Sequence, residues 1–192
     1  MINIDRRNPW ILWTNSICPN FLNKSAGDLI KGDQYYKITM DFSYTEGHKK
    51  DLFAIVPNYT GFSIVDNRIF LGIGYQDKDD WFDTEYEIKP NTKINLVVEH
   101  KPSNTLTIIV DNFEVYKADL SSRPLAIMND PQMFIGAGKW TGSKEPNSMD
   151  FCLSYLKIED ELEVYAEHNF DKIIHSKSVD TTGKNNFIYR LR

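Results

Sequence analysis

The sequence has little cysteine and no long apolar run. Its two cysteines, Cys18 and Cys152, lie far apart and form no C-x-x-C motif, so a disulfide-dense framework is excluded. Two unpaired thiols are the simpler interpretation, and a single disulfide joining the N-terminal region to a late strand remains open. The longest apolar stretches, such as residues 53–56 and 108–110, are far too short to cross a bilayer. No membrane insertion is therefore expected.

Long basic runs are also missing. No run of Lys or Arg exceeds the pairs Arg6-Arg7 and Lys49-Lys50, and the formal net charge of the 192 residues is -5. Nucleic-acid binding usually rests on a basic face, so no nucleic-acid partner is expected. Residues 1–16 lack the long apolar segment and the small-residue cleavage site of a secretory signal. We therefore expect synthesis in the cytosol, without a signal peptide or an ordinary export route.

Helical periodicity is absent from every window of a dozen or more residues, and the dominant period is two. In residues 36–44, apolar and polar side chains alternate, which is typical of a half-buried strand in an antiparallel sheet. The apolar face of this strand consists of Tyr36, Ile38, Met40, Phe42 and Tyr44.

Similar short runs recur along the whole chain. They occupy residues 52–56, 62–65, 68–75, 94–100, 105–110, 113–120, 132–138, 149–160, 161–170 and 186–191. The pairs Asp66-Asn67 and Asp111-Asn112 separate neighbouring runs and suit two-residue turns, because Asn and Asp tolerate positive φ. Many short strands at regular spacing predict an all-β fold, as an antiparallel β-sandwich or a barrel.

The order of these segments resembles the concanavalin A-like lectin/glucanase superfamily, especially its laminin G-like jelly rolls. The hairpin TLTIIVDNFEVY (105–116) carries Asp111-Asn112 where the family has Asp-Gly in a Tyr-Val-Asp-Gly turn. Ile135, Gly136 and Gly138 match the family's Ile-Gly-x-Gly strand. The apolar positions of its last strand are matched by Leu153, Leu156 and Ile158.

This resemblance covers roughly residues 33–160 and implies a jelly-roll sandwich. We expect residues 1–192 to form a single concanavalin A-like domain. Residues 1–32 would be an N-terminal extension or edge segment, and residues 171–192 a closing C-terminal strand. That last segment resembles the opening of other family members, and its Phe187, Tyr189 and Leu191 alternate as in a strand.

The sequence does not carry the catalytic motifs of the family's enzymes. Retaining glucanases place two carboxylates about 5–5.5 Å apart, on an E-x-D-x-x-E strand that is not found here, and no lyase-type Arg or His motif appears. Glu159, Glu161 and Glu163 would share one solvated strand face. The four histidines have neither metal-ligand nor triad spacing and are expected at the surface. We therefore do not expect an enzyme.

The richest candidate for a binding site is the stretch GYQDKDDWFDTEYEI (74–88), interpreted as a loop. Sugar recognition combines a flat aromatic face with carboxylate or amide groups, and often a Ca²⁺ ion bound by oxygen ligands. The candidate ligand-binding residues are Tyr75, Asp79, Asp80, Trp81, Asp83 and Tyr86, together with Trp140 of a second polar loop, 139–148. Asp77, Asp79 and Asp83 are weak candidates for Ca²⁺ ligands. The alternative is that the aromatic residues only anchor the loop and the acids are solvated.

Two classes of function follow from the resemblance, and fold alone does not choose between them. The first is a non-catalytic, lectin-like module that recognises cell-surface or polymeric glycans, in the setting of a phage or virion adhesin. The second is a structural virion or assembly protein, such as a decoration, fibre or baseplate subunit, which contacts other virion subunits or copies of itself as a homo-oligomer. A glycan-degrading enzyme of the same fold is a second alternative to the lectin-like module.

Overall fold

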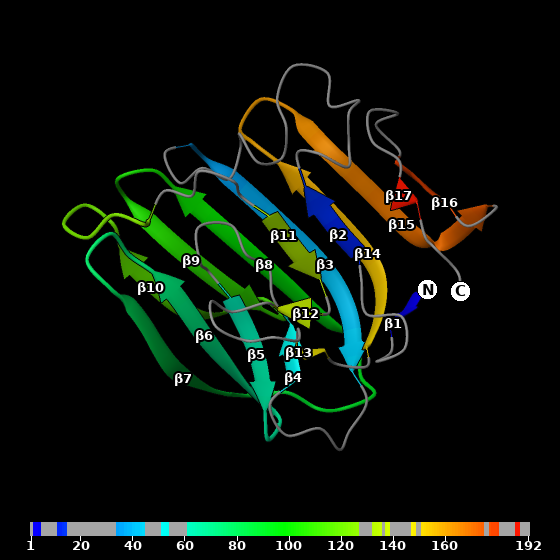
Figure 1. Ribbon diagram of the computed structural model, residues 1–192, viewed down its shortest axis with the longest axis horizontal. Coiled ribbons are helices and arrows are strands. Elements are labelled where there is room, and N and C mark those ends of the chain that lie inside the picture. Colours follow the sequence, from blue (N-terminus) through cyan, green and yellow to red (C-terminus); the bar gives the residue numbers. More distant parts are fainter. Residues whose placement is uncertain are drawn as a thin grey trace.

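The protein is described by a computed structural model, and all of its described elements are β-strands. The structure describes residues 2–4, 11–14, 34–44, 51–53, 61–126, 132–135, 137–138, 147–148, 151–174, 177–180 and 187–188. Within these ranges there is no helix long and apolar enough to cross a membrane. The strands are arranged in antiparallel sheets, which confirms the predicted all-β class (Figure 1).

The larger sheet contains nine strands among the described residues. Their order is β10 (Phe113–Asp119), β9 (Thr105–Val110), β8 (Ile94–Lys101), β3 (Tyr36–Tyr44), β14 (Phe151–Glu159), β15 (Val164–Ile174), β16 (Lys177–Asp180) and β17 (Phe187–Ile188). Strand β1 (Ile2–Ile4) pairs with the beginning of β14, opposite residues 151–153. The two ends of the chain thus both contribute strands to this sheet.

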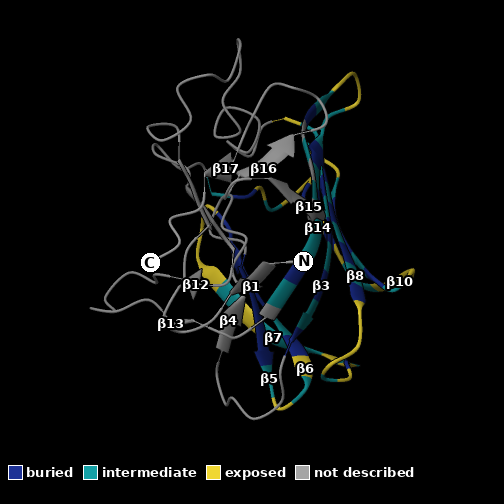
Figure 2. Cartoon of the chain, turned by 90° about the vertical axis from the view of Figure 1, so that its right-hand side faces the viewer, coloured by how far each residue is buried: buried dark blue, intermediate teal, exposed yellow. Residues whose placement is uncertain are grey.

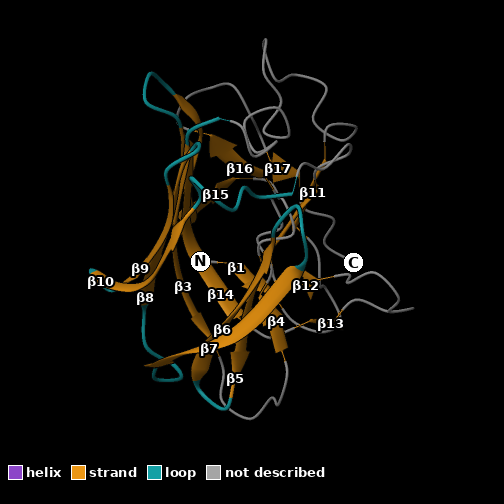
Figure 3. Cartoon of the chain, turned by 90° about the vertical axis from the view of Figure 1, so that its left-hand side faces the viewer, coloured by secondary structure: helices purple, strands orange, loops and turns teal. Residues whose placement is uncertain are grey.

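The second sheet is a meander of four strands. They follow one another in the order β4 (Asp51–Phe53), β5 (Gly61–Val65), β6 (Arg68–Gly74) and β7 (Asp79–Glu87). Two further pairs join β2 (Ile11–Thr14) to β11 (Gln132–Ile135), and β12 (Ala137–Gly138) to β13 (Asn147–Ser148). Edge-on views from opposite sides show β5, β6 and β7 as a layer separate from β3, β8 and β14 (Figures 2 and 3).

The hydrophobic core lies between the two sheets. Along β3 buried and half-buried residues alternate strictly, and its five inward side chains are the apolar face predicted from the sequence. Facing strands of the second sheet contribute Phe62, Leu71 and Ile73, which are also buried. The alternation has period two because successive side chains of a strand point to opposite sides of the sheet.

Both predicted two-residue turns are confirmed. Asp66 and Asn67 have φ angles of 49° and 64°, and Asp111 and Asn112 have 49° and 69°. Positive φ at both central residues defines the type I′ turn, whose twist matches the flanking strands. Each turn is also tied to the sheet beyond its hairpin. The Asp111 carboxylate accepts a hydrogen bond of 2.8 Å from the Asn95 N–H, and the Asn67 carbonyl accepts one of 2.8 Å from the Ile88 N–H.

The interpretation of residues 74–88 as a loop was wrong over most of its length. Residues Asp79–Glu87 form β7, the nine-residue outer strand of the second sheet. Acidic residues on both faces hide the alternation that marks interior strands. Charged side chains are common on edge strands, where they oppose pairing with another chain. The candidate site is therefore displayed on a sheet and not on a loop.

The expectation that every histidine lies at the surface was also wrong. His100 is only 1% exposed. Its ring stacks on that of Tyr36 with centroids 4.9 Å apart, and its Nδ1 lies 2.7 Å from the Gln34 carbonyl oxygen. The period of β8 turns His100 inward, and this polar contact makes its burial tolerable.

The acidic segment 159–163 does not present three glutamates on one strand face. Strand β14 ends at Glu159 and β15 begins at Val164, so a turn lies between them. The Asp160 carboxylate accepts hydrogen bonds from the Leu162 and Glu163 N–H groups at 2.7 and 2.8 Å. An aspartate side chain that captures the following N–H groups favours a turn over a continued strand.

Candidate functional site

Strand β7 divides the predicted ligand residues between its two faces. In the register with β6, Trp81 lies opposite Gly72, Asp83 opposite Phe70 and Asp79 opposite Gly74. These three β7 residues alternate along the strand and therefore share one face. Asp80 points to the other face, where its neighbour across the strand is the buried Ile73. The structure thus brings together part of the predicted set and separates the rest.

Trp81 forms an exposed aromatic shelf on the outer surface of the second sheet. Trp81 is 49% exposed. A Cβ atom added to Gly72 would lie 2.5, 2.6 and 2.8 Å from the Trp81 ring atoms Cζ2, Cη2 and Cε2. Three neighbouring ring atoms at nearly equal distances mean that the ring lies face-on over the glycine. One ring face is thus supported by the backbone of β6, an approach that only a residue without a side chain allows.

The two aspartates on either side of Trp81 differ in their hydrogen bonds and ion pairs. One oxygen of Asp83 lies 3.2 Å from an Arg68 nitrogen, and the other accepts a hydrogen bond of 2.8 Å from the Glu85 N–H. The hydrogen bond from Asp83 raises the pKa of Arg68 above its ordinary value. Asp79 is exposed, and its carboxylate has no hydrogen bond or ion pair within the part of the chain that the structure describes.

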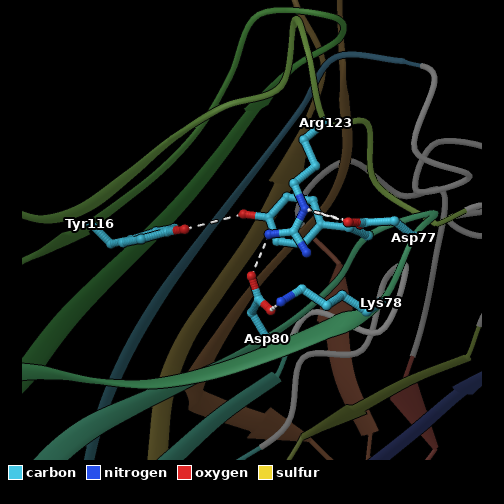
Figure 4. A network of polar contacts seen from close by, with 6 residues as sticks. Asp77, Lys78, Asp80, Tyr116 and Arg123 are labelled. Carbon is cyan, nitrogen blue, oxygen red and sulfur yellow. Dashed lines mark hydrogen bonds and ion pairs between the residues drawn. The ribbon is translucent and has the colours of Figure 1, made fainter.

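Tyr75, Asp77 and Asp80 belong to a separate cluster centred on Arg123, which we call the Arg123 cluster (Figure 4). The guanidinium carbon lies 3.8 Å from the centre of the Tyr75 ring, a cation–π contact. Its Nε lies 2.9 Å from one Asp77 oxygen and 3.1 Å from the other, while Nη1 bonds to Asp80. Lys78 contacts the other oxygen of Asp80 at 3.4 Å.

Tyr75 is a buried anchor. It is 6% exposed, and its hydroxyl lies 3.2 Å from that of Tyr116. The backbone around it is bonded to the segment that carries Arg123, because the Gln76 N–H donates to the Pro124 carbonyl and the Ala126 N–H to the Gly74 carbonyl. Tyr75 therefore fits the anchoring alternative and lies apart from the exposed shelf.

Tyr86 lies at the far end of β7, beyond a β-bulge. The bulge places Glu85 at a φ of 61°, and the Thr84 hydroxyl donates to the Ile69 carbonyl at 2.7 Å. The extra residues turn Tyr86 to the edge of the core, where its ring centre is 6.4 Å from that of Phe113. Burial raises the pKa of the Tyr86 hydroxyl.

Trp140 and Cys18 fall outside the described residues.

The calcium prediction receives no geometric support from its three residues. Within the described residues no group of three His, Cys, Asp or Glu side chains is placed to hold a metal ion. Asp77 binds Arg123 and Asp83 binds Arg68, so these two carboxylates neutralise different arginines and do not converge with Asp79. The physical reason is that Asp77 lies in the turn before β7, whereas Asp79 and Asp83 lie on its outer face.

Sequence reasoning missed Arg123 and Gly72. Arg123 follows its two aspartate partners by 43 and 46 residues, and no local pattern predicts a contact over that separation. Gly72 did carry a signal, because glycine inside a strand often marks a close approach by another group. Gly72 and Gly74 lie two residues apart and therefore on the same face of one strand. This pair of glycines could have pointed to the aromatic residue that packs on that face.

Replacing Arg123 by glutamine is expected to make the acid stability of the protein less steep. Hydrogen bonds from its guanidinium hold the pKa of Asp77 and of Asp80 below the ordinary value. Groups with a lowered native pKa contribute stability above their unfolded pKa, about 3.9 for Asp, and this contribution is lost as pH falls through the native pKa. The wild type should therefore lose more stability than Arg123→Gln between pH 5 and pH 2, as measured by urea unfolding.

Lys117→Gln is the matched control, because it removes one positive charge from an exposed position on β10. It should keep the wild-type pH dependence. Equal slopes for the wild type and Arg123→Gln would show that the Arg123 cluster does not stabilise the turn.

The two antiparallel sheets face each other around a shared core and form a β-sandwich of the jelly-roll type. The fold is similar to that of a candidate carbohydrate-binding protein from Bacteroides ovatus, with a TM-score of 0.58 at 10% identity over 81% of this chain. The chain spans about half of that protein, 52% of its length.

Two further solved structures have lower TM-scores. The LG4-5 domains of the mouse laminin alpha1 chain have a TM-score of 0.49 at 18% identity, covering 72% of this chain and 38% of that one. The enzymatically active domain of bacteriophage CBA120 tailspike protein 2 has a TM-score of 0.49 at 10% identity, covering 74% and 27%. No family model matches the sequence, and no curated protein matches it. At these identities the likeness concerns the fold alone.

Proposed function

We propose that the chain is a non-catalytic carbohydrate-binding module that recognises cell-surface or polymeric glycans through the Trp81 shelf. The observation that carries the proposal is the packing of the Trp81 ring face-on over Gly72, with 49% of the residue exposed. An aromatic ring held flat on a sheet is a rigid platform, and about half of this residue is exposed to a ligand. A platform of this kind needs little ordering on binding, so less free energy is lost when a ligand stacks on it.

Polar groups flank the platform at a useful spacing. Asp79 and Asp83 lie two residues on either side of Trp81, which corresponds to roughly 7 Å along a strand. A pyranose ring stacked on the indole would carry its equatorial hydroxyls toward these carboxylates. Hydrogen bonds to ionised acceptors are about twice as strong as neutral ones, so they would orient the sugar while the indole supplies apolar contact.

The fold likeness to the Bacteroides ovatus protein is consistent with this role, and the site geometry carries the proposal. Attachment of a phage or virion to a glycan-bearing surface is the biological setting that we propose for it. The alternative, an assembly subunit that uses the sandwich for protein–protein contacts, makes a different prediction for the same variant, as follows.

Trp81→Ala is expected to weaken glycan binding by about 10- to 100-fold. Losing one stacked aromatic contact removes about 1.5–3 kcal/mol of apolar burial, and 1.4 kcal/mol is a factor of ten in affinity. Binding would first be located on a glycan array and then measured by calorimetry with the strongest ligand. The matched control is Phe113→Ala, because Phe113 is another exposed aromatic residue, at 66%, on a different strand. It should bind as the wild type does.

A failure of the wild type to bind any arrayed glycan would contradict the proposal. So would equal binding by Trp81→Ala and the wild type. If the wild type also forms a stable trimer or larger ring by light scattering, and Trp81→Ala leaves that assembly intact, the assembly role replaces glycan binding.

A further inference from the structure

Strand β7, which carries the Trp81 shelf, and the turn before it are strongly acidic. Six carboxylates lie on β7 and in the turn before it, and three cations approach them from β6, from the turn and from the segment after β10. The carboxylates are Asp77, Asp79, Asp80, Asp83, Glu85 and Glu87, and the cations are Arg68, Lys78 and Arg123. Carboxylates therefore exceed cations by three in this part of the surface, although both signs are present.

Each of these cations already forms an ion pair with a particular carboxylate. Arg68 lies 3.2 Å from Asp83 and 3.7 Å from Glu87. The other two cations bind Asp77 and Asp80 within the Arg123 cluster (Figure 4). An anionic ligand on Trp81 would have to compete with these ion pairs for its counter-charge. Such competition lowers its net gain in binding free energy.

Asp79 is the carboxylate beside the shelf that remains uncommitted. It is exposed and has no hydrogen bond or ion pair among the described residues. Its position shares the outer face with Trp81, opposite Gly74, which has no side chain to shield it. A carboxylate has two oxygens and accepts only. It can therefore accept two neighbouring hydroxyls of a sugar, but it repels a second carboxylate, a sulfate or a phosphate.

We propose that the Trp81 shelf takes uncharged glycans and rejects anionic polysaccharides, and that Asp79 is the residue that sets this selectivity. The inference rests on the proposed glycan-binding function and names its ligand class. The charge of a uronate on the indole would lie within about 7 Å of Asp79, given the strand spacing. At that distance the Coulomb repulsion in water alone weakens binding about threefold, and it should fall as salt is added.

Matched ligands and a matched variant test the selectivity. Maltohexaose, cellohexaose and mannohexaose would each be compared with the same hexaose oxidised at C6 to uronates, at low and at physiological salt. The wild type should prefer at least one neutral hexaose over its oxidised form by about threefold or more. In Asp79→Asn, which keeps an acceptor but removes the charge, this preference should shrink toward one. Glu114→Gln loses a carboxylate from the exposed side of β10 and should keep the wild-type preference.

The outcomes separate the inference from the function on which it rests. If the wild type binds an oxidised hexaose as well as its neutral form, or if Asp79→Asn keeps the full preference, the selectivity inference is overturned while glycan binding stands. If neither form of any hexaose binds and the array is also negative, the glycan-binding function fails. Loss of all binding in Asp79→Asn, with an unchanged unfolding curve, would overturn the selectivity role by making Asp79 an indispensable contact.

Discussion

Leu71→Ala is expected to destabilise the protein by about 2–5 kcal/mol, the usual cost of emptying a buried leucine site. Leu71 is fully buried. In the register of the second sheet it lies between Phe62 on β5 and Phe82 on β7. Large rings on both sides cannot collapse far into the space, so the cavity should persist and the cost should be high. Urea unfolding followed by circular dichroism would measure it.

Leu162→Ala is the control with the same chemical change. Leu162 is 91% exposed in the turn between β14 and β15, so its truncation should change stability by less than about 0.5 kcal/mol. A loss at Leu71 no larger than the loss at Leu162 would mean that the two sheets do not share the core described above.

Gly72→Ala is expected to cost about 1–3 kcal/mol, the usual penalty for overpacking, and to abolish the stacked position of Trp81. The new methyl group would lie 2.5 Å from the indole Cζ2 atom, which is far inside a van der Waals contact. Because Trp81 is half exposed, its ring can turn outward into solvent and relieve most of the clash. Stability should therefore fall toward the lower end of the range, while glycan binding should fall as much as in Trp81→Ala.

The double variant isolates the cause. Without the indole, an alanine at residue 72 should be neutral, or stabilising by roughly 0.5–1 kcal/mol, because glycine in a strand interior is the less favourable residue. A coupling energy near zero between Gly72→Ala and Trp81→Ala would refute the contact between the ring and the glycine. The cycle needs only the free energies of unfolding of four proteins.

Strand β6 contributes to both the core and the shelf. Side chains alternate on β6, so Leu71 joins the core while Gly72 supports the shelf on the opposite face. A shift of one residue in register would exchange these roles. The stability of the core therefore maintains the position of the proposed binding surface.

The local elements of the fold were readable from the sequence. The alternation of apolar and polar residues predicted a strand at residues 36–44, and every second residue of that strand is buried in the structure. The turns at Asp66-Asn67 and Asp111-Asn112 were predicted because Asn and Asp accept positive φ, and all four residues have it. Signals of this kind depend on neighbours along the chain, so they survive without any knowledge of the tertiary structure.

Residues of the candidate site were identified by type, but their grouping was not predictable. Trp81, Asp79 and Asp83 share one face because residues 79–87 form a strand, and the acidic residues on both of its faces obscure that strand in the sequence. His100 seemed a surface residue and is buried, because the hydrogen-bond distance to Gln34 and the stacking on Tyr36 arise only when β8 pairs with β3.

The sequence by itself determined the class of the fold, its hairpins and the chemical types available for binding, because period and turn propensity are local properties. Only the tertiary structure decided which of those groups can act together. In the tertiary structure Arg123 binds Asp77 and Asp80, which precede it by 46 and 43 residues. Trp81 lies over Gly72, and Asp79 lies on the same face of β7. Those contacts depend on strand register and on the packing of one sheet against the other, which the whole chain sets at once.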